Sequence, residues 1–134
     1  LAVGIMQRAL DEAVAYAKQR KQFGRRLIDF EMVQAMLADM AIKTEAARVL
    51  VNNCMRQMDA GEMVRKDGAI VKTFVTDAMQ EVVSNAVQVL GGYGYSEEYP
   101  VEKLMRDAKI FQIFEGSNQI QRMTIAKELD REYR

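Results

Sequence analysis

A long apolar stripe at helical spacing is the feature of this sequence that most restricts its fold. Apolar and small side chains recur at alternating steps of three and four residues, at Phe30, Val33, Leu37, Met40, Thr44, Ala47, Val51, Cys54 and Met58. This heptad pattern predicts one long amphipathic helix, which ends at Gly61. Roughly 30 helical residues, at a rise of about 1.5 Å each, form a rod of about 45 Å.

Four other segments also carry helical patterns. They cover residues 1–22, 64–90, 100–109 and 117–131. A double glycine ends the second of these segments, and Ser117 can cap the last helix. No segment alternates with period two for long enough to form a strand. Long antiparallel rods with short connections predict an all-α fold, an up-down four-helix bundle with an additional short helix, in a single domain over residues 1–134.

The composition excludes several kinds of chemistry. Lysine plus arginine and aspartate plus glutamate both number 19, so no net field favours nucleic acid. There is no histidine and only one cysteine, Cys54. These counts argue against zinc and di-iron sites, and they exclude serine-histidine or cysteine-histidine catalysis within this chain. No apolar run reaches the roughly 20 residues that a membrane-spanning helix needs.

Glu115 is the candidate catalytic residue. It follows an apolar, aromatic run and precedes Gly116, Ser117 and the start of the last predicted helix. The simplest interpretation is an acid that the helix dipole favours near a helix N-terminus. The alternative is a carboxylate held among apolar side chains, where it is poorly solvated as an anion and becomes a competent base near neutral pH. Gly116 is either a hinge at the helix entry or a glycine that lets the backbone approach a substrate.

Two further stretches suit an anionic cofactor. Lys18, Arg20, Lys21, Arg25 and Arg26 form a basic cluster, which is either a solvated face at a helix C-terminus or an anion site. The stretch from residue 88 to residue 92 is either a plain helix end or a place where glycine backbone approaches a cofactor closely.

Three separated stretches, Arg20–Gly24, Gln88–Tyr95 and Arg106–Arg122, together resemble the C-terminal helical domain of the acyl-CoA dehydrogenases. The resemblance covers essentially the whole chain and is nearest to the short- and medium-chain, butyryl-CoA-type members. It implies that an N-terminal helical domain and a middle β domain precede this one in the parent protein. It also implies a flavoprotein that uses FAD to convert an acyl-CoA thioester to a trans-2-enoyl-CoA.

The resemblance assigns a role to each candidate site residue. Glu115 matches the base that removes the α-proton, FAD takes the β-hydrogen as a hydride, and Gly116 lies against the substrate. Arg20 matches an arginine that holds the FAD pyrophosphate. The complete set of cofactor-binding candidates is Arg20, Gln22, Glu31, Gln88, Val89, Leu90, Gly91, Gly92, Ser117, Asn118 and Gln119. Glu31 stands where the family has glutamine, and Ser117 where it has threonine. An acid near a pyrophosphate would need compensation from Arg25 or Arg26.

The resemblance also implies partners. Electrons would pass to an electron-transfer flavoprotein, and the parent would be a homo-oligomer, a dimer or tetramer. Apolar residues beside the main seams favour self-association, namely Leu50, Met55, Met79 and Val83. The parent would be cytoplasmic if bacterial and in the mitochondrial matrix if eukaryotic, and the 134-residue chain alone would be inactive. Two alternatives stay open: a non-catalytic helical oligomerisation module, and an acyl-CoA oxidase or enoyl-CoA reductase on the same scaffold.

Overall fold

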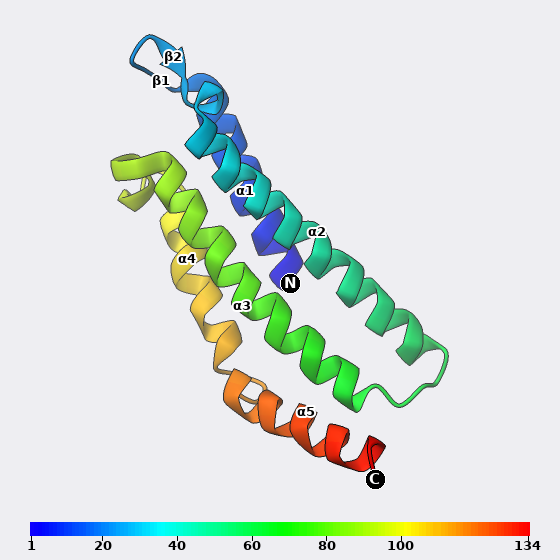
Figure 1. The fold of residues 1–134 in the computed structure, drawn as a ribbon. Helices are drawn as coiled ribbons and strands as arrows, with labels where there is room; N and C mark the ends of the chain where they lie inside the picture. The colour runs from blue at the N-terminus through cyan, green and yellow to red at the C-terminus, as the bar shows by residue number, and fades with distance from the viewer.

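Five α-helices make up almost the whole molecule (Figure 1), and the computed structural model describes all 134 residues. The helices are α1 (Ala2–Gln19), α2 (Glu31–Asp59), α3 (Arg65–Leu90), α4 (Val101–Lys109) and α5 (Asn118–Glu132). The long helices α2 and α3 run antiparallel and are joined by a short turn. This arrangement confirms the all-α prediction of four longer helices and one short helix. None of the helices is both long and apolar enough to cross a membrane.

Helix α3 lies at the centre of the fold and contacts each of the other four helices. The core contains alanines from α1, at positions 9, 13 and 17, which let neighbouring backbones approach closely. Met79 and Val83 of α3 are fully buried in this core, so the prediction that they add to an exposed surface is wrong. Because α3 is covered on several sides, its apolar surface is buried well beyond a single stripe.

The predicted stripe of α2 is buried over most of its length. Leu37, Met40, Thr44, Ala47 and Cys54 are buried as expected, whereas Met58 at the far end is 53% exposed. Helix α1 is shorter than α2 and leaves the C-terminal end of α2 uncovered (Figure 1). The stripe therefore correctly predicts the helix, but not how far its neighbour covers it.

A small hairpin replaces the last turn of the first predicted helix. Helix α1 ends at Gln19, and strands β1 (Lys21–Gln22) and β2 (Arg25–Arg26) pair antiparallel. Phe23 and Gly24 form the two-residue turn with positive φ values of 51° and 75°, the backbone that tight hairpins require. Neither strand was predicted from the sequence, because two residues per strand are too few for an alternating pattern.

The connections around α4 place two regions that carry candidate site residues. Gly91 ends α3 with a φ of 62°, and the 3-10 helix η2 (Gly91–Tyr95) follows. A second 3-10 helix, η3 (Ile110–Gln112), extends α4 and leads into the turn before α5. As predicted, the hydroxyl of Ser117 caps α5 by accepting a hydrogen bond from the N–H of Ile120.

Candidate functional site

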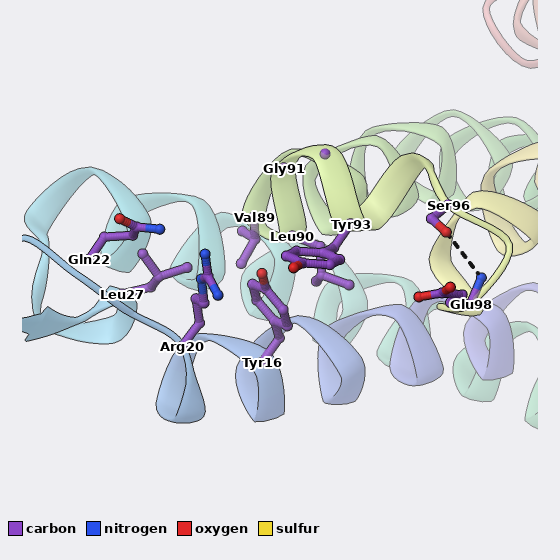
Figure 2. Close-up of a pocket in the computed structure, with 11 residues that line it drawn as sticks. Tyr16, Arg20, Gln22, Leu27, Val89, Leu90, Gly91, Tyr93, Ser96 and Glu98 are labelled. Carbon is purple, nitrogen blue, oxygen red and sulfur yellow. Dashed lines mark hydrogen bonds between the residues drawn. The ribbon is translucent and has the colours of Figure 1, made fainter.

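A groove lies between the C-terminal ends of α1 and α3 (Figure 2). Its volume is about 610 Å³. Six of the residues predicted to bind a cofactor line it together, although they come from two stretches far apart in the sequence: Arg20, Gln22, Val89, Leu90, Gly91 and Gly92. We call this the α1/α3 groove. The fold thus brings the first two motifs to one place.

Arg20 supplies the positive charge of the α1/α3 groove. It follows the last residue of α1 and has extended backbone, and its guanidinium carbon lies 5.5 Å from the centroid of the Tyr93 ring. No carboxylate of the chain forms an ion pair with it. Its charge is therefore available to an anionic ligand, while the aromatic ring holds the side chain in place.

Three tyrosines form an aromatic cluster beside Arg20. The Tyr99 ring centroid lies 5.8 Å from that of Tyr16 and 5.7 Å from that of Tyr93, both with steeply inclined rings. Burial raises the pKa of Tyr16, and the positive charge of Arg20 opposes that rise. The cluster packs at a helix corner and supports the side chain of Arg20.

Glycine backbone forms the other wall of the α1/α3 groove. A Cβ atom added at Gly91 or Gly92 would meet no atom within 4 Å, so the backbone there borders open space, while the N–H of Gly91 donates to the carbonyl oxygens of Val87 and Gln88. Gly94 differs, since its Cβ would come within 2.5 Å of the Val87 carbonyl oxygen. An unpaired guanidinium, an amide at Gln22, glycine backbone that a ligand can approach closely, and the apolar side chains of Val89 and Leu90 fit the dinucleotide part of FAD.

Two predicted cofactor residues lie outside the lining of this groove. Gln88 is exposed on α3, and Glu31 is exposed at the first residue of α2. The expected compensation of Glu31 by a neighbouring arginine is not observed. Arg26 pairs with Asp29, with an N–O distance of 2.8 Å, and Arg25 stacks over the ring of Phe30. Both arginines are thus engaged by other residues of the hairpin region.

Glu115 and Gly116 form a turn between η3 and α5 that has an unusual backbone. Both residues have positive φ, 54° for Glu115 and 81° for Gly116. For a non-glycine residue this left-handed conformation costs roughly 1–2 kcal/mol, and such strain concentrates at functional sites. The amide of Gln121 donates to the carbonyl oxygens of both residues, at 3.1 and 3.3 Å. The chain therefore holds Glu115 in a conformation that it would not adopt freely.

The surroundings of Glu115 differ from those expected from the sequence. The residue is exposed, and so are Ile113 and Phe114 just before it. The Phe111 and Phe114 rings pack edge to face at 5.0 Å but do not enclose the carboxylate. The prediction that the chain itself buries this acid among apolar side chains is therefore wrong.

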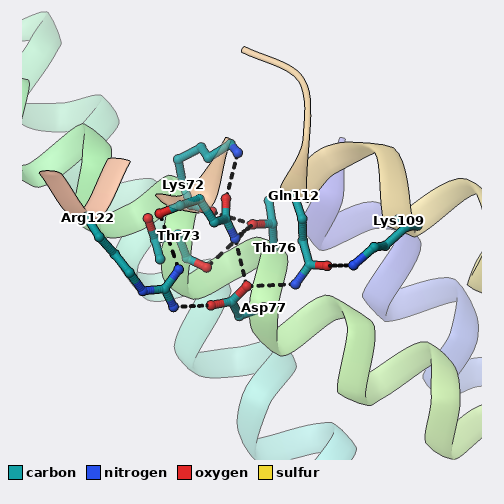
Figure 3. Close-up of polar contacts among 8 residues, drawn as sticks. Lys72, Thr73, Thr76, Asp77, Lys109, Gln112 and Arg122 are labelled. Carbon is teal, nitrogen blue, oxygen red and sulfur yellow. Dashed lines mark hydrogen bonds and ion pairs between the residues drawn. The ribbon is translucent and has the colours of Figure 1, made fainter. Parts of the chain in front are cut away.

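A polar network fixes the start of α5 on α3 (Figure 3). The carboxylate of Asp77 accepts hydrogen bonds from Gln112 at 2.7 Å, from Asn118 at 2.7 Å and from Arg122 at 2.6 Å. The ammonium of Lys72 donates to the side-chain oxygen of Asn118 at 2.6 Å. The network joins three elements around the turn that carries Glu115.

Two pKa values in this network depart from their ordinary values. Burial alone would raise the pKa of Asp77, but hydrogen bonds from Arg122, Gln112 and Asn118 more than offset it and hold the pKa below its usual range. Burial lowers the pKa of Lys72, and the negative charge of Asp77 opposes that shift. Asp77 is thus an anion that the fold has stabilised.

The network changes the interpretation of Asn118. Its side chain is 3% exposed and forms hydrogen bonds with Thr76, Asp77 and Lys72, so it holds α5 in place. Of the other two predicted residues here, Gln119 is exposed, and Ser117 is half-buried and caps the helix. Helix geometry leaves the first N–H groups of α5 without intrahelical partners.

Four residues of this network were not predicted from the sequence as site residues: Lys72, Asp77, Gln112 and Arg122. The only signal for Lys72 and Asp77 was that both are charged residues in a largely buried part of α3. Asp77, for example, lies between buried Thr76 and buried Ala78.

The chain is similar to known proteins over most of its length. The profile of the family "Acyl-CoA dehydrogenase, C-terminal domain" matches residues 1–129. A "Probable acyl-CoA dehydrogenase FadE25" of Mycobacterium tuberculosis is 51% identical over 129 residues, which are 96% of this chain and 33% of that protein. The "Caffeyl-CoA reductase-Etf complex subunit CarC" of Acetobacterium woodii is 46% identical over 124 residues, 92% of this chain and 33% of that protein.

A solved structure shows the same fold. Butyryl-CoA dehydrogenase from Megasphaera elsdenii superposes with a TM-score of 0.94 at 48% identity, over 96% of this chain and 33% of that chain. The chain therefore spans about a third of the length of the relatives it matches. Profile, sequence identity and fold agree, and the chain belongs to the acyl-CoA dehydrogenase family, in which it corresponds to the C-terminal domain.

Proposed function

We propose that this chain is the C-terminal domain of an FAD-dependent enzyme that dehydrogenates an acyl-CoA thioester to a trans-2-enoyl-CoA. The observation that carries the proposal is the Glu115–Gly116 turn. It presents an exposed carboxylate from a strained, firmly held backbone, in a chain 48% identical to a butyryl-CoA dehydrogenase. A residue held in a rare conformation, with its acid group open to a partner surface, suits a catalytic group better than a structural one.

The role proposed for Glu115 is that of the general base. Its carboxylate takes the α-proton, which the thioester carbonyl acidifies. The chemistry that FAD supplies when bound is acceptance of the β-hydrogen as a hydride. Since Glu115 is exposed in this chain, the apolar cover that excludes water from the carboxylate has to come from the other domains or from the acyl chain. Gly116, next to the base, is a glycine where the protein backbone would come close to the substrate.

The α1/α3 groove is the proposed site for the dinucleotide part of FAD. Arg20 would hold the pyrophosphate, and Gln22 would add hydrogen bonds. The glycines at 91 and 92 would let the cofactor come close to the backbone, beside the apolar side chains of Val89 and Leu90. Ser117, Asn118 and Gln119 would contact the flavin end, Asn118 through its backbone N–H because its side chain is engaged. Gln88 and Glu31 stay candidates from outside the groove.

The positions of the two sites support a homo-oligomer. Lys72 lies beside the Glu115–Gly116 turn, whereas the α1/α3 groove begins near Leu90, about 27 Å further along α3 at a rise of about 1.5 Å per residue. One chain would therefore serve two FAD molecules, its groove reaching the cofactor of a neighbouring subunit. Exposed apolar side chains on α2 and α5 supply a surface for such an assembly, at Met32, Ile42, Val49, Met55, Ile120 and Met123.

A reductase that works in the opposite direction is the second candidate. The observation that favours it is the 46% identity to a subunit of a caffeyl-CoA reductase-Etf complex. The same Glu115 would then return a proton to the α-carbon. The name of that relative and a similar structure described as an electron transferring flavoprotein of Acidaminococcus fermentans support an electron-transfer flavoprotein as partner in either direction.

The absorbance spectrum of the full-length parent protein tests the proposal. Added butyryl-CoA, octanoyl-CoA or cyclohexane-1-carbonyl-CoA should bleach the bound flavin if the parent is a dehydrogenase. Reoxidation of chemically reduced flavin by an enoyl-CoA, without bleaching by any saturated acyl-CoA, would favour the reductase. A parent protein that binds no flavin, or whose flavin responds to neither saturated acyl-CoAs nor enoyl-CoAs, would contradict both enzyme functions. The non-catalytic oligomerisation module would then be the remaining alternative.

A further inference from the structure

The Asp77 carboxylate accepts hydrogen bonds from both arms of the turn that carries Glu115, that is, from the residues just before and just after the turn. Asp77 accepts a hydrogen bond at 2.7 Å from Gln112, three residues before Glu115, and another at 2.7 Å from Asn118, three residues after it (Figure 3). Both bonds go to the same oxygen, Oδ1, while Oδ2 accepts from Arg122 at 2.6 Å. The entry and the exit of the turn are therefore tied to a single point on α3.

Each of the two amides that donate to Asp77 Oδ1 is itself oriented by another contact. The ammonium of Lys109 donates to the side-chain oxygen of Gln112 at 2.7 Å, which turns the amide nitrogen of Gln112 toward Asp77. Lys72 does the same for Asn118 by donating to its side-chain oxygen at 2.6 Å. Lys72 also donates to the carbonyl oxygen of Gly116 at 2.9 Å, so the turn itself is held as well as its two ends.

We propose that Asp77 is the residue that positions the Glu115 carboxylate for proton abstraction. This inference rests on the proposed function, because it concerns where the base stands. Glu115 has a left-handed backbone, which it would tend to leave if the two arms separated. A displacement of about 1 Å from the reacting atoms can cost on the order of 100-fold in rate. Asp77 does not touch the substrate and acts only through the turn.

Asp77→Asn is the direct variant. Asparagine keeps the size and one acceptor oxygen, but its amide nitrogen has to face either Arg122 or the amides of Gln112 and Asn118. In the first case the bond that fixes Arg122 of α5 is lost, and in the second both arms of the turn lose their acceptor. Gln112→Leu is a milder variant that removes the entry arm alone, at a half-buried position.

Glu132→Gln is the matched control. Glu132 accepts from Lys66 at 2.6 Å, so this pair also joins α5 to α3 through a charge, at the opposite end of α5 from Glu115. Glu132→Gln therefore removes one negative charge from a contact between α3 and α5, as Asp77→Asn does, but leaves the Glu115 turn unchanged.

The experiment is stopped-flow reduction of the flavin in the full-length holoenzyme by whichever of butyryl-CoA, octanoyl-CoA or cyclohexane-1-carbonyl-CoA bleaches it fastest. The limiting rate, the half-saturating concentration and the flavin content are measured for each variant. In Asp77→Asn the limiting rate should fall about 10- to 100-fold, with the half-saturating concentration changed by less than about threefold. Gln112→Leu should lose about three- to tenfold, and Glu132→Gln should stay within about twofold. Substrate deuterated at the α-carbon should show a larger isotope effect in the first two variants than in wild type, which a merely looser fold would not produce.

Limiting rates within about twofold of wild type in both Asp77→Asn and Gln112→Leu would overturn the inference. An equal fall in Glu132→Gln would overturn it too, because any break between the two helices would then suffice. If Asp77→Asn fails to retain flavin, Gln112→Leu decides by the same criterion. Glu115→Gln, measured alongside, separates the two claims. If the flavin of Glu115→Gln still bleaches, Glu115 is not the base. If Glu115→Gln does not bleach but Asp77→Asn and Gln112→Leu react at the wild-type rate, only the role of Asp77 is contradicted.

Discussion

The ammonium of Lys72 lies 2.6 Å from the side-chain oxygen of Asn118, and this contact joins the N-terminal half of α3 to the first residue of α5. The same ammonium reaches the carbonyl oxygen of Gly116 at 2.9 Å. Asn118 is 3% exposed, so water cannot readily replace the lysine as its donor. The turn that carries the proposed base is thus held by a helix that lies far from it in the sequence.

Lys72→Met should destabilise the parent protein by about 1–3 kcal/mol. The side-chain oxygen of Asn118 would stay buried and lose its donor, which is the costly case for a polar group. Urea unfolding measures the change, and Lys127→Met, which removes an exposed lysine of α5 without a salt bridge, is the control. Equal stability of the two variants would show that the Lys72 contact contributes nothing.

Gly116→Ala and Gly4→Ala should shift stability in opposite directions. Gly116 has a φ of 81°, and a Cβ there would lie 2.8 Å from the side-chain nitrogen of Gln121. Gln121 can move aside, so the main cost is the left-handed backbone, roughly 1–2 kcal/mol. Gly4 lies on exposed helix with no atom near its Cβ, where alanine should add about 0.5–1 kcal/mol. Thermal unfolding distinguishes the two, and a Gly116→Ala variant as stable as wild type would contradict the assigned backbone.

The fold could be predicted largely from the sequence because its signals are local and long. The stripe from residue 30 to residue 58 and the double glycine after Leu90 set α2 and the end of α3 within a few residues. The hairpin was missed because it has only two residues per strand, and its positive-φ turn includes Phe23, a residue type that rarely adopts it. Met79 is fully buried because several helices surround α3, and the number of neighbouring helices cannot be predicted from a local sequence pattern.

The site could be predicted only in part. Arg20 and the glycines at 91 and 92 were predicted from their motifs as cofactor-binding candidates, and the structure brings them together in one groove. The Asp77 network was not found because its members come from three elements, and no spacing along the chain connects them. The exposure of Glu115 was also missed, since an apolar run next to an acid does not show whether those side chains turn toward it.

Arg20→Met should weaken FAD binding by the full-length parent by about 10- to 100-fold. A hydrogen-bonded charge contributes about 1.5–3 kcal/mol, and Arg20 is the cation of the α1/α3 groove that has no carboxylate partner. Titration of the flavin-free parent with FAD gives the dissociation constant. Lys18→Met removes an equal charge from the last turn of α1 outside the groove and should leave the constant unchanged. Equal weakening by both substitutions would mean that only net charge matters.

The Asp77 network should loosen in acid. Hydrogen bonds hold the pKa of Asp77 in the folded state below the ordinary value of about 3.9, so its contribution is complete above about pH 4. The contribution is lost as the pH falls through the folded pKa. The charged groups that face Asp77 are Arg122 and Lys72, and both stay protonated over this range. The difference in melting temperature between wild type and Asp77→Asn should be constant near neutral pH and shrink below about pH 4. A difference that persists unchanged to pH 3 would contradict this assignment.

Glu115→Gln in the full-length parent tests the central claim most directly. Glutamine keeps the size of the side chain at this exposed turn, so FAD and acyl-CoA binding should be retained. Because an amide cannot take up the α-proton, flavin reduction should be lost. The measurement is stopped-flow bleaching of the flavin by the acyl-CoA that reduces the wild-type protein. Loss of a positioned base should lower the rate by at least about 10²- to 10⁴-fold. A variant whose flavin bleaches within about tenfold of the wild-type rate would show that Glu115 is not the base, and that this acid only favours the start of α5.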